Sequence, residues 1–124
     1  MFDIDLQSRI PIYEQLYKRV VEMTVKKQLS PGDKLPSVRE LAKSLGVNPN
    51  TVSKAFQSLE RDGIIYSLAG RGSFISESNG NAIKENARAD FKTAVKDALS
   101  AGLTAEDMTE IIADTTSIGG TKLD

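Results

Sequence analysis

The feature that most constrains this chain is a pair of helical patterns separated by a very short turn. The segment "LPSVRELAKSLG" (residues 35–46) spaces its apolar residues as one face of a helix and ends in glycine, which favours the left-handed conformation just past a helix. The next segment, "GVNPNTVSKAF" (residues 46–56), begins with turn-forming residues and then returns to helical spacing. A short helix, a tight turn and a second helix in this order predict a helix-turn-helix.

Capping signals mark the start of both helices. Ser37 and Glu40 form the S-x-x-E pattern of a capping box, in which side chain and backbone satisfy each other's exposed polar groups. Asn48 is a good N-cap, and Pro49 is favoured as a first helical residue. The apolar face predicted for the second helix consists of Val52, Ala55, Phe56 and Leu59.

The helix-turn-helix is flanked by a longer helix and a hairpin. Pro11 opens an amphipathic pattern that runs to about Gln28 and stops at the turn cluster "SPGD". The segment "IIYSLAGRGSFIS" (residues 64–76) is rich in β-branched and aromatic residues on both sides of "AGRG", so it predicts a hairpin with Arg71 at its tip. The polar stretch "SESNGNA" (residues 76–82) predicts a linker.

The remaining residues predict a helical tail. One helix is expected from about Ala87 to Gly102, a second after an N-cap at Thr104, and the final "GGTKLD" is expected to fray. The predicted fold class is mainly α with a small β-hairpin (α+β), a winged helix-turn-helix domain followed by a two-helix dimerisation tail. The predicted domains are residues 1–76 and 77–124.

The composition excludes several classes of function. The chain contains no Cys and no His, so Ser-His-Asp and Cys-His mechanisms are excluded, and the commonest metal ligands are missing. Chemistry by carboxylates alone remains open in principle, but no glycine-rich phosphate loop is present, so we expect neither an enzyme nor a cofactor. There is no apolar run long enough to span a membrane and no signal peptide at the start, which leaves a cytoplasmic location as the expectation.

The net charge of −1 hides an asymmetry along the chain. Residues 1–76 contain 11 Lys and Arg against 8 Asp and Glu, a balance of +3. Residues 77–124 contain 5 against 9, a balance of −4. A basic first part and an acidic second part indicate two different roles, although random scatter in a short chain is the alternative explanation.

The polar residues of the second helix are the candidate binding surface. Asn50, Thr51, Ser53 and Lys54 lie away from its predicted apolar face. A helix-turn-helix projects the start of its second helix into the DNA major groove, where each base pair shows a distinct pattern of donors and acceptors. A wing can reach phosphates or the adjacent minor groove. The alternatives are a helix cap with a solvated face, or a winged helix that serves as a protein-interaction module without specific DNA binding.

The same segments resemble a known family. "LPSVRELAKSLGVNPNTVSKAFQSLERDGII" and "GRGSFIS", with "PIYEQLYKRV" and "PGDKLPS" before them, resemble the winged-helix domain of the GntR family of bacterial transcription regulators over residues 9–76. The 48 residues that follow are too few for the large effector domains of most subfamilies and resemble the tail of the YtrA subfamily. This resemblance implies a homodimeric repressor, often of an operon that encodes an ABC transporter; it names no small-molecule effector.

The resemblance also implies roles for individual residues. Arg39 matches an arginine that contacts DNA near the groove edge, and Gly70 and Arg71 match the wing tip. The alternatives are an ion pair for Arg39, a cap alone for Asn48, and a solvated hairpin tip for Arg71. The expected DNA-binding residues are Ser37, Arg39, Asn48, Asn50, Thr51, Ser53, Lys54, Gly70 and Arg71.

The tail is expected to form a homodimer. Two winged helices related by a two-fold axis would read a palindromic operator with half-sites about 34 Å apart. Two short helices cannot bury their own apolar stripes, although the tail could instead fold back on its own domain. The expected dimer interface consists of Phe91, Val95, Leu99, Leu103, Met108, Ile111 and Ile112.

Overall fold

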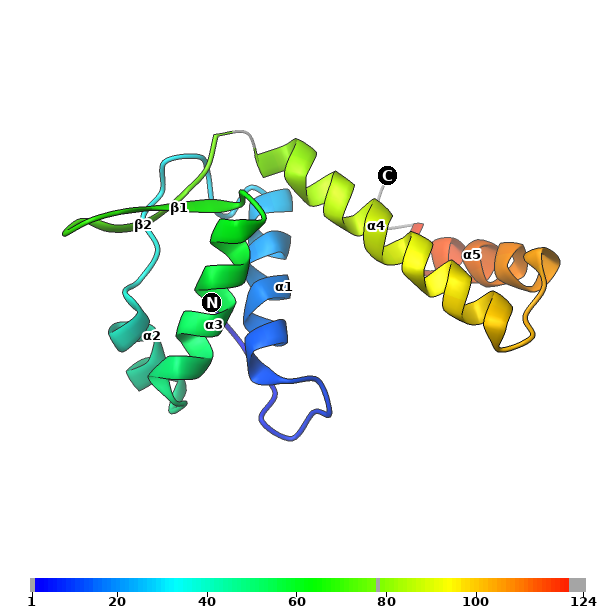
Figure 1. The fold of residues 1–124 in the computed structure, drawn as a ribbon, viewed down its shortest axis with the longest axis horizontal. Helices are drawn as coiled ribbons and strands as arrows, with labels where there is room; N and C mark the ends of the chain where they lie inside the picture. Colours follow the sequence, from blue (N-terminus) through cyan, green and yellow to red (C-terminus); the bar gives the residue numbers. More distant parts are fainter. Residues whose placement is uncertain (1, 78, 121–124) are drawn as a thin grey trace. The chain divides into compact units, whose positions relative to one another are not determined.

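The computed structural model describes residues 2–77 and 79–120 of the chain. The described residues form five helices and one antiparallel hairpin, which confirms the mainly α fold class with a small β-hairpin (Figure 1). By contacts, the chain divides into two compact units, residues 1–85 and residues 86–124. The elements are α1 (Ile12–Val25), α2 (Val38–Leu45), α3 (Pro49–Arg61), β1 (Ile65–Leu68), β2 (Gly72–Ile75), α4 (Asn79–Ser100) and α5 (Ala105–Gly120).

The core of the first unit is built on α3. This helix packs against both α1 and α2, and its Val52 and Leu59 have no exposed surface. Leu16 and Val20 of α1 are equally buried, so the apolar stripes of these helices face one another. The buried core of the unit consists of Phe2, Leu16, Val20, Met23, Leu29, Leu35, Leu41, Ala42, Val52, Ala55, Phe56, Leu59, Ile64, Ile65 and Ile75.

The helix-turn-helix caps form as the sequence predicts. The Glu40 backbone N–H donates to Ser37 Oγ at 3.0 Å, and the Ser37 N–H donates to Glu40 Oε1 at 3.1 Å. Gly46 ends α2 with φ of 71°, a left-handed conformation that glycine adopts without steric cost. The capping box and the glycine together set the length of the short helix.

The helix α1 differs from its prediction at both ends. Pro11 is the N-cap rather than the first helical residue, and the helix ends at Val25 instead of about Gln28. Lys27 takes a left-handed φ of 62°, and Leu29 then turns back into the core. Lysine rarely adopts this conformation, so the helical pattern of the sequence carried no sign of the earlier end.

The helix α4 begins inside the segment that the sequence predicts as a linker. Its first residue is Asn79, eight residues before the predicted start at about Ala87. Ile83 packs against the core of the first unit, and Ala82 lies near Gly63. This packing favours helix where the polar sequence alone indicates a loop, because tertiary contacts can override weak local preference.

The hairpin is held by a third segment of chain. β1 pairs with β2 in the register Ile65↔Ile75 to Leu68↔Gly72, and the Tyr66 and Phe74 rings stack at 5.6 Å between centroids. The connection between α1 and α2 pairs with the other edge of β2. Its hydrogen bonds are Leu35 N to Ser73 O at 2.9 Å, Ile75 N to Asp33 O at 2.9 Å, and Gly32 N to Ile75 O at 2.8 Å.

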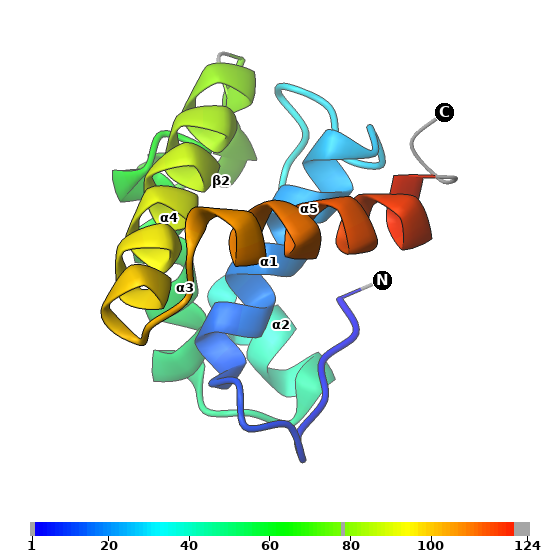
Figure 2. The same cartoon turned by 90° about the vertical axis from the view of Figure 1, so that its right-hand side faces the viewer.

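The second unit is a helical pair. Thr104 caps α5 as predicted: the Asp107 N–H donates to Thr104 Oγ1 at 3.1 Å, and the Thr104 N–H donates to Asp107 Oδ2 at 2.9 Å. Gly102, with φ of 99°, forms part of the turn, from which α4 and α5 diverge in Figure 2. The fraying expected for the end of the chain concerns residues 121–124, which lie outside the described residues.

Candidate nucleic-acid interface

The polar face of α3 lies opposite its core anchors. Asn50, Lys54 and Gln57 are exposed, whereas Thr51 and Ser53 are half-buried at the edges of this face. Complete burial of Val52 and Leu59 fixes the rotation of the helix about its axis. The core therefore determines which side chains α3 presents outward.

Asn48 has the capping role that its position predicts. Its side-chain oxygen accepts a hydrogen bond from the Asn50 backbone N–H at 2.8 Å. This bond uses the carbonyl of the amide and leaves the NH₂ group to donate elsewhere. The structure therefore establishes the cap and leaves a base or phosphate contact by Asn48 as a prediction.

The side chain of Lys54 reaches from the polar face of α3 toward α1. Its ammonium is 4.0 Å from the centroid of the Tyr13 ring, a cation–π contact between α3 and α1. Tyr13 in turn packs against the core of the unit. No sequence pattern linked these two residues, because they are 41 positions apart and on different helices.

The helix α2 contributes cations beside α3. Arg39 is exposed, and none of the side chains in residues 2–77 or 79–120 forms an ion pair or hydrogen bond with its guanidinium. Lys43 is also exposed one helical turn later, so both charges lie on the same side of α2. Sequence reasoning missed Lys43, which the four-residue spacing from Arg39 would have indicated.

The capping box also perturbs a charge near this surface. The hydrogen bond from the Ser37 backbone holds the pKa of the Glu40 carboxyl below its usual value, aided by the Ser37 hydroxyl and by the positive charge of Lys34. Partial desolvation opposes these effects. The Ser37 hydroxyl already accepts from the Glu40 N–H, so its first role is structural.

The hairpin presents Arg71 at its tip. The Arg71 backbone N–H donates to the Leu68 carbonyl at 2.9 Å, and Gly70 takes the positive φ of 75° that this turn requires. The Ser67 hydroxyl lies 3.2 Å from Glu60 Oε1 of α3 and 3.2 Å from the Ser73 hydroxyl. These bonds tie the Ser67–Ser73 pair, one pair before the turn of the hairpin, to α3, while the Arg71 side chain remains exposed.

A further contact, which the sequence did not indicate, fixes the other end of α3. The Tyr17 hydroxyl donates to Asp62 Oδ2 at 2.6 Å, and Arg61 Nε lies 3.3 Å from Asp62 Oδ1. Asp62 is the C-cap of α3, so this bond connects its last turn to α1. In Figure 1, α2 and the hairpin extend to the same side of α3.

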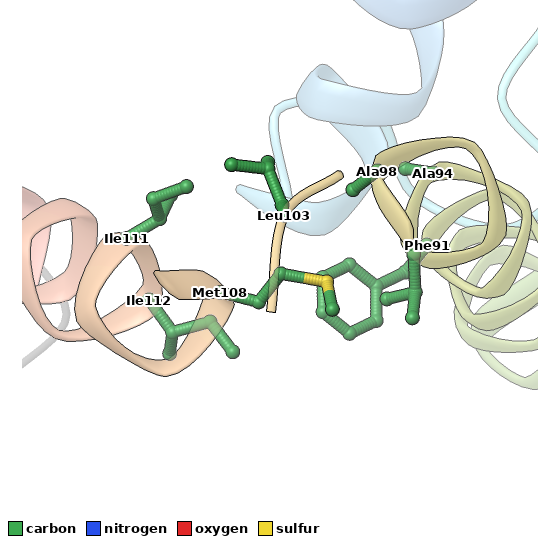
Figure 3. A pocket seen from close by; sticks show the side chains of 8 residues that line it. Phe91, Ala94, Ala98, Leu103, Met108, Ile111 and Ile112 are labelled. Carbon is green, nitrogen blue, oxygen red and sulfur yellow. The ribbon is translucent and has the colours of Figure 1, made fainter. Parts of the chain in front are cut away.

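The second unit carries an apolar groove between α4 and α5. Six of the seven expected interface residues line it; the seventh, Leu99, lies outside the lining and is 53% exposed. In Figure 3, Met108 points from α5 toward Phe91 of α4. The lining residues are Phe91, Ala94, Val95, Ala98, Leu103, Met108, Ile111 and Ile112.

Among the residues that the structure describes, no helix is both long and apolar enough to cross a membrane.

Comparison with known proteins identifies related sequences and folds. Residues 12–75 match the model for bacterial regulatory proteins of the gntR family. The HTH-type transcriptional repressor YtrA of Bacillus subtilis (strain 168) is 46% identical over 118 residues, which cover 92% of this chain and 91% of the relative.

Solved structures extend the comparison to the fold. A crystal structure of a transcriptional antiterminator from Listeria monocytogenes EGD-e has a TM-score of 0.69 and 36% identity, covering 94% of this chain and 90% of the other. The DNA-binding domain of AraR in complex with operator ORX1 has a TM-score of 0.54 and 28% identity, covering 60% of this chain and 92% of the other.

Proposed function

Because the chain belongs to the GntR family of bacterial regulatory proteins and is a transcriptional regulator with a DNA-binding domain, we propose that it acts as a homodimeric repressor of a palindromic operator. The related proteins described above are named as transcriptional regulators and not as enzymes. The observation that carries the proposal is the surface formed by α2, α3 and the hairpin, where polar and cationic side chains are exposed on rigidly anchored elements.

Each element of this surface has its own role in the proposal. The start of α3, with Asn48, Asn50, Thr51, Ser53 and Lys54, enters the major groove and reads base edges or holds phosphates. Ser37 and Arg39 of α2 contact the backbone at the groove edge. Gly70 and Arg71 bring the hairpin tip to a minor groove or a phosphate.

By forming a dimer, the tail brings the DNA-binding domain of a second copy to the same DNA. Phe91 is 55% exposed and Ile111 is 51% exposed, so the helical pair leaves much of its apolar surface uncovered. The groove encloses about 160 Å³ and is lined by apolar side chains, whereas pockets for small ligands usually enclose about 300–1,000 Å³ and include polar groups. These properties favour the apolar side chains of a second copy over a small-molecule effector as the occupant.

The test compares DNA from upstream of the chain's own gene with unrelated DNA in a gel shift. We expect a preference for the upstream DNA, and weaker binding by Arg39→Ala and by Arg71→Ala, each with a shallower dependence on salt. Equal binding of all DNA would favour a protein-interaction module instead. Unchanged binding by both variants would refute the assigned surface.

The target and location are also proposals. The resemblance to the YtrA subfamily favours a transporter operon, which a transporter gene adjacent to this one would support. A repressor acts on chromosomal DNA, so we place the protein in the bacterial cytoplasm.

A further inference from the structure

Lys34 lies at the edge of the hairpin and is not among the DNA-contacting residues proposed above. Its backbone forms a β-bridge with Phe74, and the residues on either side of it hydrogen-bond to β2. These bonds are Leu35 N to Ser73 O and Ile75 N to Asp33 O, both at 2.9 Å. Figure 1 shows this cyan connection beside the hairpin before it enters α2. The position of Lys34 is therefore fixed relative to the wing and to α2.

The side chain of Lys34 crosses β2 at Gly72. A Cβ atom placed on Gly72 would lie 3.1 Å from Lys34 Cε and 3.9 Å from Lys34 Nζ. The stem of Lys34 thus occupies the space that a side chain at residue 72 would fill. Gly72 directly follows Arg71, so the Lys34 ammonium lies toward the tip of the hairpin.

The charge of Lys34 is available to a ligand. Lys34 is exposed, and within the described part of the chain its ammonium has no ion pair or hydrogen bond. Its field reaches the start of α2, where it helps to lower the pKa of Glu40. That carboxylate already accepts the Ser37 N–H, and it is 3.1 Å from that nitrogen. Lys34 therefore places a cation between α2 and the hairpin tip.

We propose that Lys34 is a further phosphate-binding residue of the DNA interface, held between the wing and the start of α2 by its path across Gly72. The proposal rests on the DNA-binding function proposed above. A lysine acts as a compact point charge, so it suits a backbone phosphate rather than a base edge. Its contribution to binding is expected to be independent of DNA sequence.

The test is the salt dependence of DNA binding, measured by fluorescence anisotropy on DNA from upstream of the chain's own gene. Lys34→Met keeps the aliphatic stem over Gly72 and removes the charge. Losing one phosphate contact should make the slope of log K against log salt shallower by about 0.9. Lys34→Arg should retain the wild-type slope. Lys18→Met, which removes an exposed charge from α1 that pairs with Glu14, is the matched control and should also retain it.

The outcomes separate the two proposals. If the wild-type protein prefers the upstream DNA to unrelated DNA and Lys34→Met keeps the wild-type salt slope, the role of Lys34 is refuted and the DNA-binding function stands. If the wild-type protein shows neither a preference for the upstream DNA nor a salt-dependent affinity, both proposals fail. Lys34→Gln is a second neutral variant, and thermal unfolding of each variant verifies that the fold is intact.

Discussion

At the residue scale, the most informative side chain is Lys54, because its contact with Tyr13 competes with binding to DNA. The sequence places Lys54 on the polar face of α3, whereas the structure holds its ammonium 4.0 Å from the centre of the Tyr13 ring. A cation–π contact at an exposed site is worth about 0.5–1 kcal/mol. Lys54 must give up this contact before it can bind a phosphate outside the ring's reach.

Tyr13→Leu should therefore strengthen binding to unrelated DNA. Without the ring, Lys54 no longer has to give up the cation–π contact when it binds DNA. Removing this cost of about 0.5–1 kcal/mol should raise the affinity about two- to fivefold. Tyr13→Phe keeps a ring and should bind as the wild type does. The measurement is anisotropy with a non-operator duplex, repeated in a Lys54→Ala background. The same gain in both backgrounds would show that Tyr13 acts by another route.

Glu40 gives a prediction about pH. Its pKa is lower in the folded protein than its ordinary value because the carboxylate accepts the Ser37 N–H. The stabilisation is therefore complete above the ordinary pKa of about 4.3 and is lost as pH falls through the lower, folded-state pKa. Urea unfolding should show Glu40→Gln to be less stable than wild type at neutral pH, with the difference vanishing in acid. A difference that is constant with pH would contradict this account.

The residues that could be predicted from the sequence are those whose partners are close along the chain. Ser37 with Glu40 and Asn48 with Asn50 lie within one helical turn, so a local pattern specifies each pair. The Tyr17–Asp62 hydrogen bond joins residues 45 positions apart. Only the packing of α1 on α3 brings such residues together, and no spacing rule encodes it.

At the element scale, the early end of α1 and the early start of α4 share one physical cause. Lys27 turns the chain at the end of α1 so that Leu29 can enter the core, and Ile83 packs against the core from the first turns of α4. In both places burial of an apolar side chain outweighs a local preference of less than about 1 kcal/mol per residue. The α2–turn–α3 element follows its prediction because caps, turn residues and apolar spacing agree there.

The path of Lys34 across the hairpin predicts the effect of filling the space at Gly72. Gly72→Ala should destabilise the first unit by about 1–2 kcal/mol, because residue 72 has φ of 110° and the new Cβ would lie 3.1 Å from Lys34 Cε. Urea unfolding measures the change.

Gly80→Ala is the matched control for this substitution. Gly80 is helical, and a Cβ there would meet nothing within 4 Å, so alanine should be neutral or stabilising by about 0.5–1 kcal/mol. Equal effects of the two substitutions would show that neither the backbone at Gly72 nor its contact with Lys34 matters for stability.

At the scale of the whole molecule, the two parts of the chain on either side of residue 76 differ in charge and in chemistry. The first 76 residues carry the net positive charge and the candidate DNA surface, and the residues after them carry the net negative charge and the apolar groove. An acidic tail would be repelled by DNA, whereas its exposed apolar residues can be buried against those of a second tail. We therefore propose that nucleic-acid recognition and self-association belong to different parts of the chain.

If the groove is the dimer interface, a charge placed in it should disrupt the dimer, whereas the same charge beside it should not. Ile112→Glu should convert a dimer to a monomer and weaken operator binding, because a carboxylate cannot be buried in an apolar interface without a partner. Ala113→Glu introduces the same group at the next position, which does not line the groove, and should leave the dimer intact. Light scattering coupled to size-exclusion chromatography gives the oligomeric state. Monomeric wild-type protein would refute the dimer outright.

The central claim is that two copies of the α2–turn–α3 and hairpin surface read a palindrome. The most direct measurement is selection of bound sequences from a random library of double-stranded DNA by the full chain, followed by sequencing. We predict enrichment of one inverted repeat with half-sites about 34 Å apart, and its loss in Asn50→Ala, which removes a side chain assigned to base edges. A pool that remains random after repeated rounds, or that converges on a single half-site without symmetry, would contradict the claim.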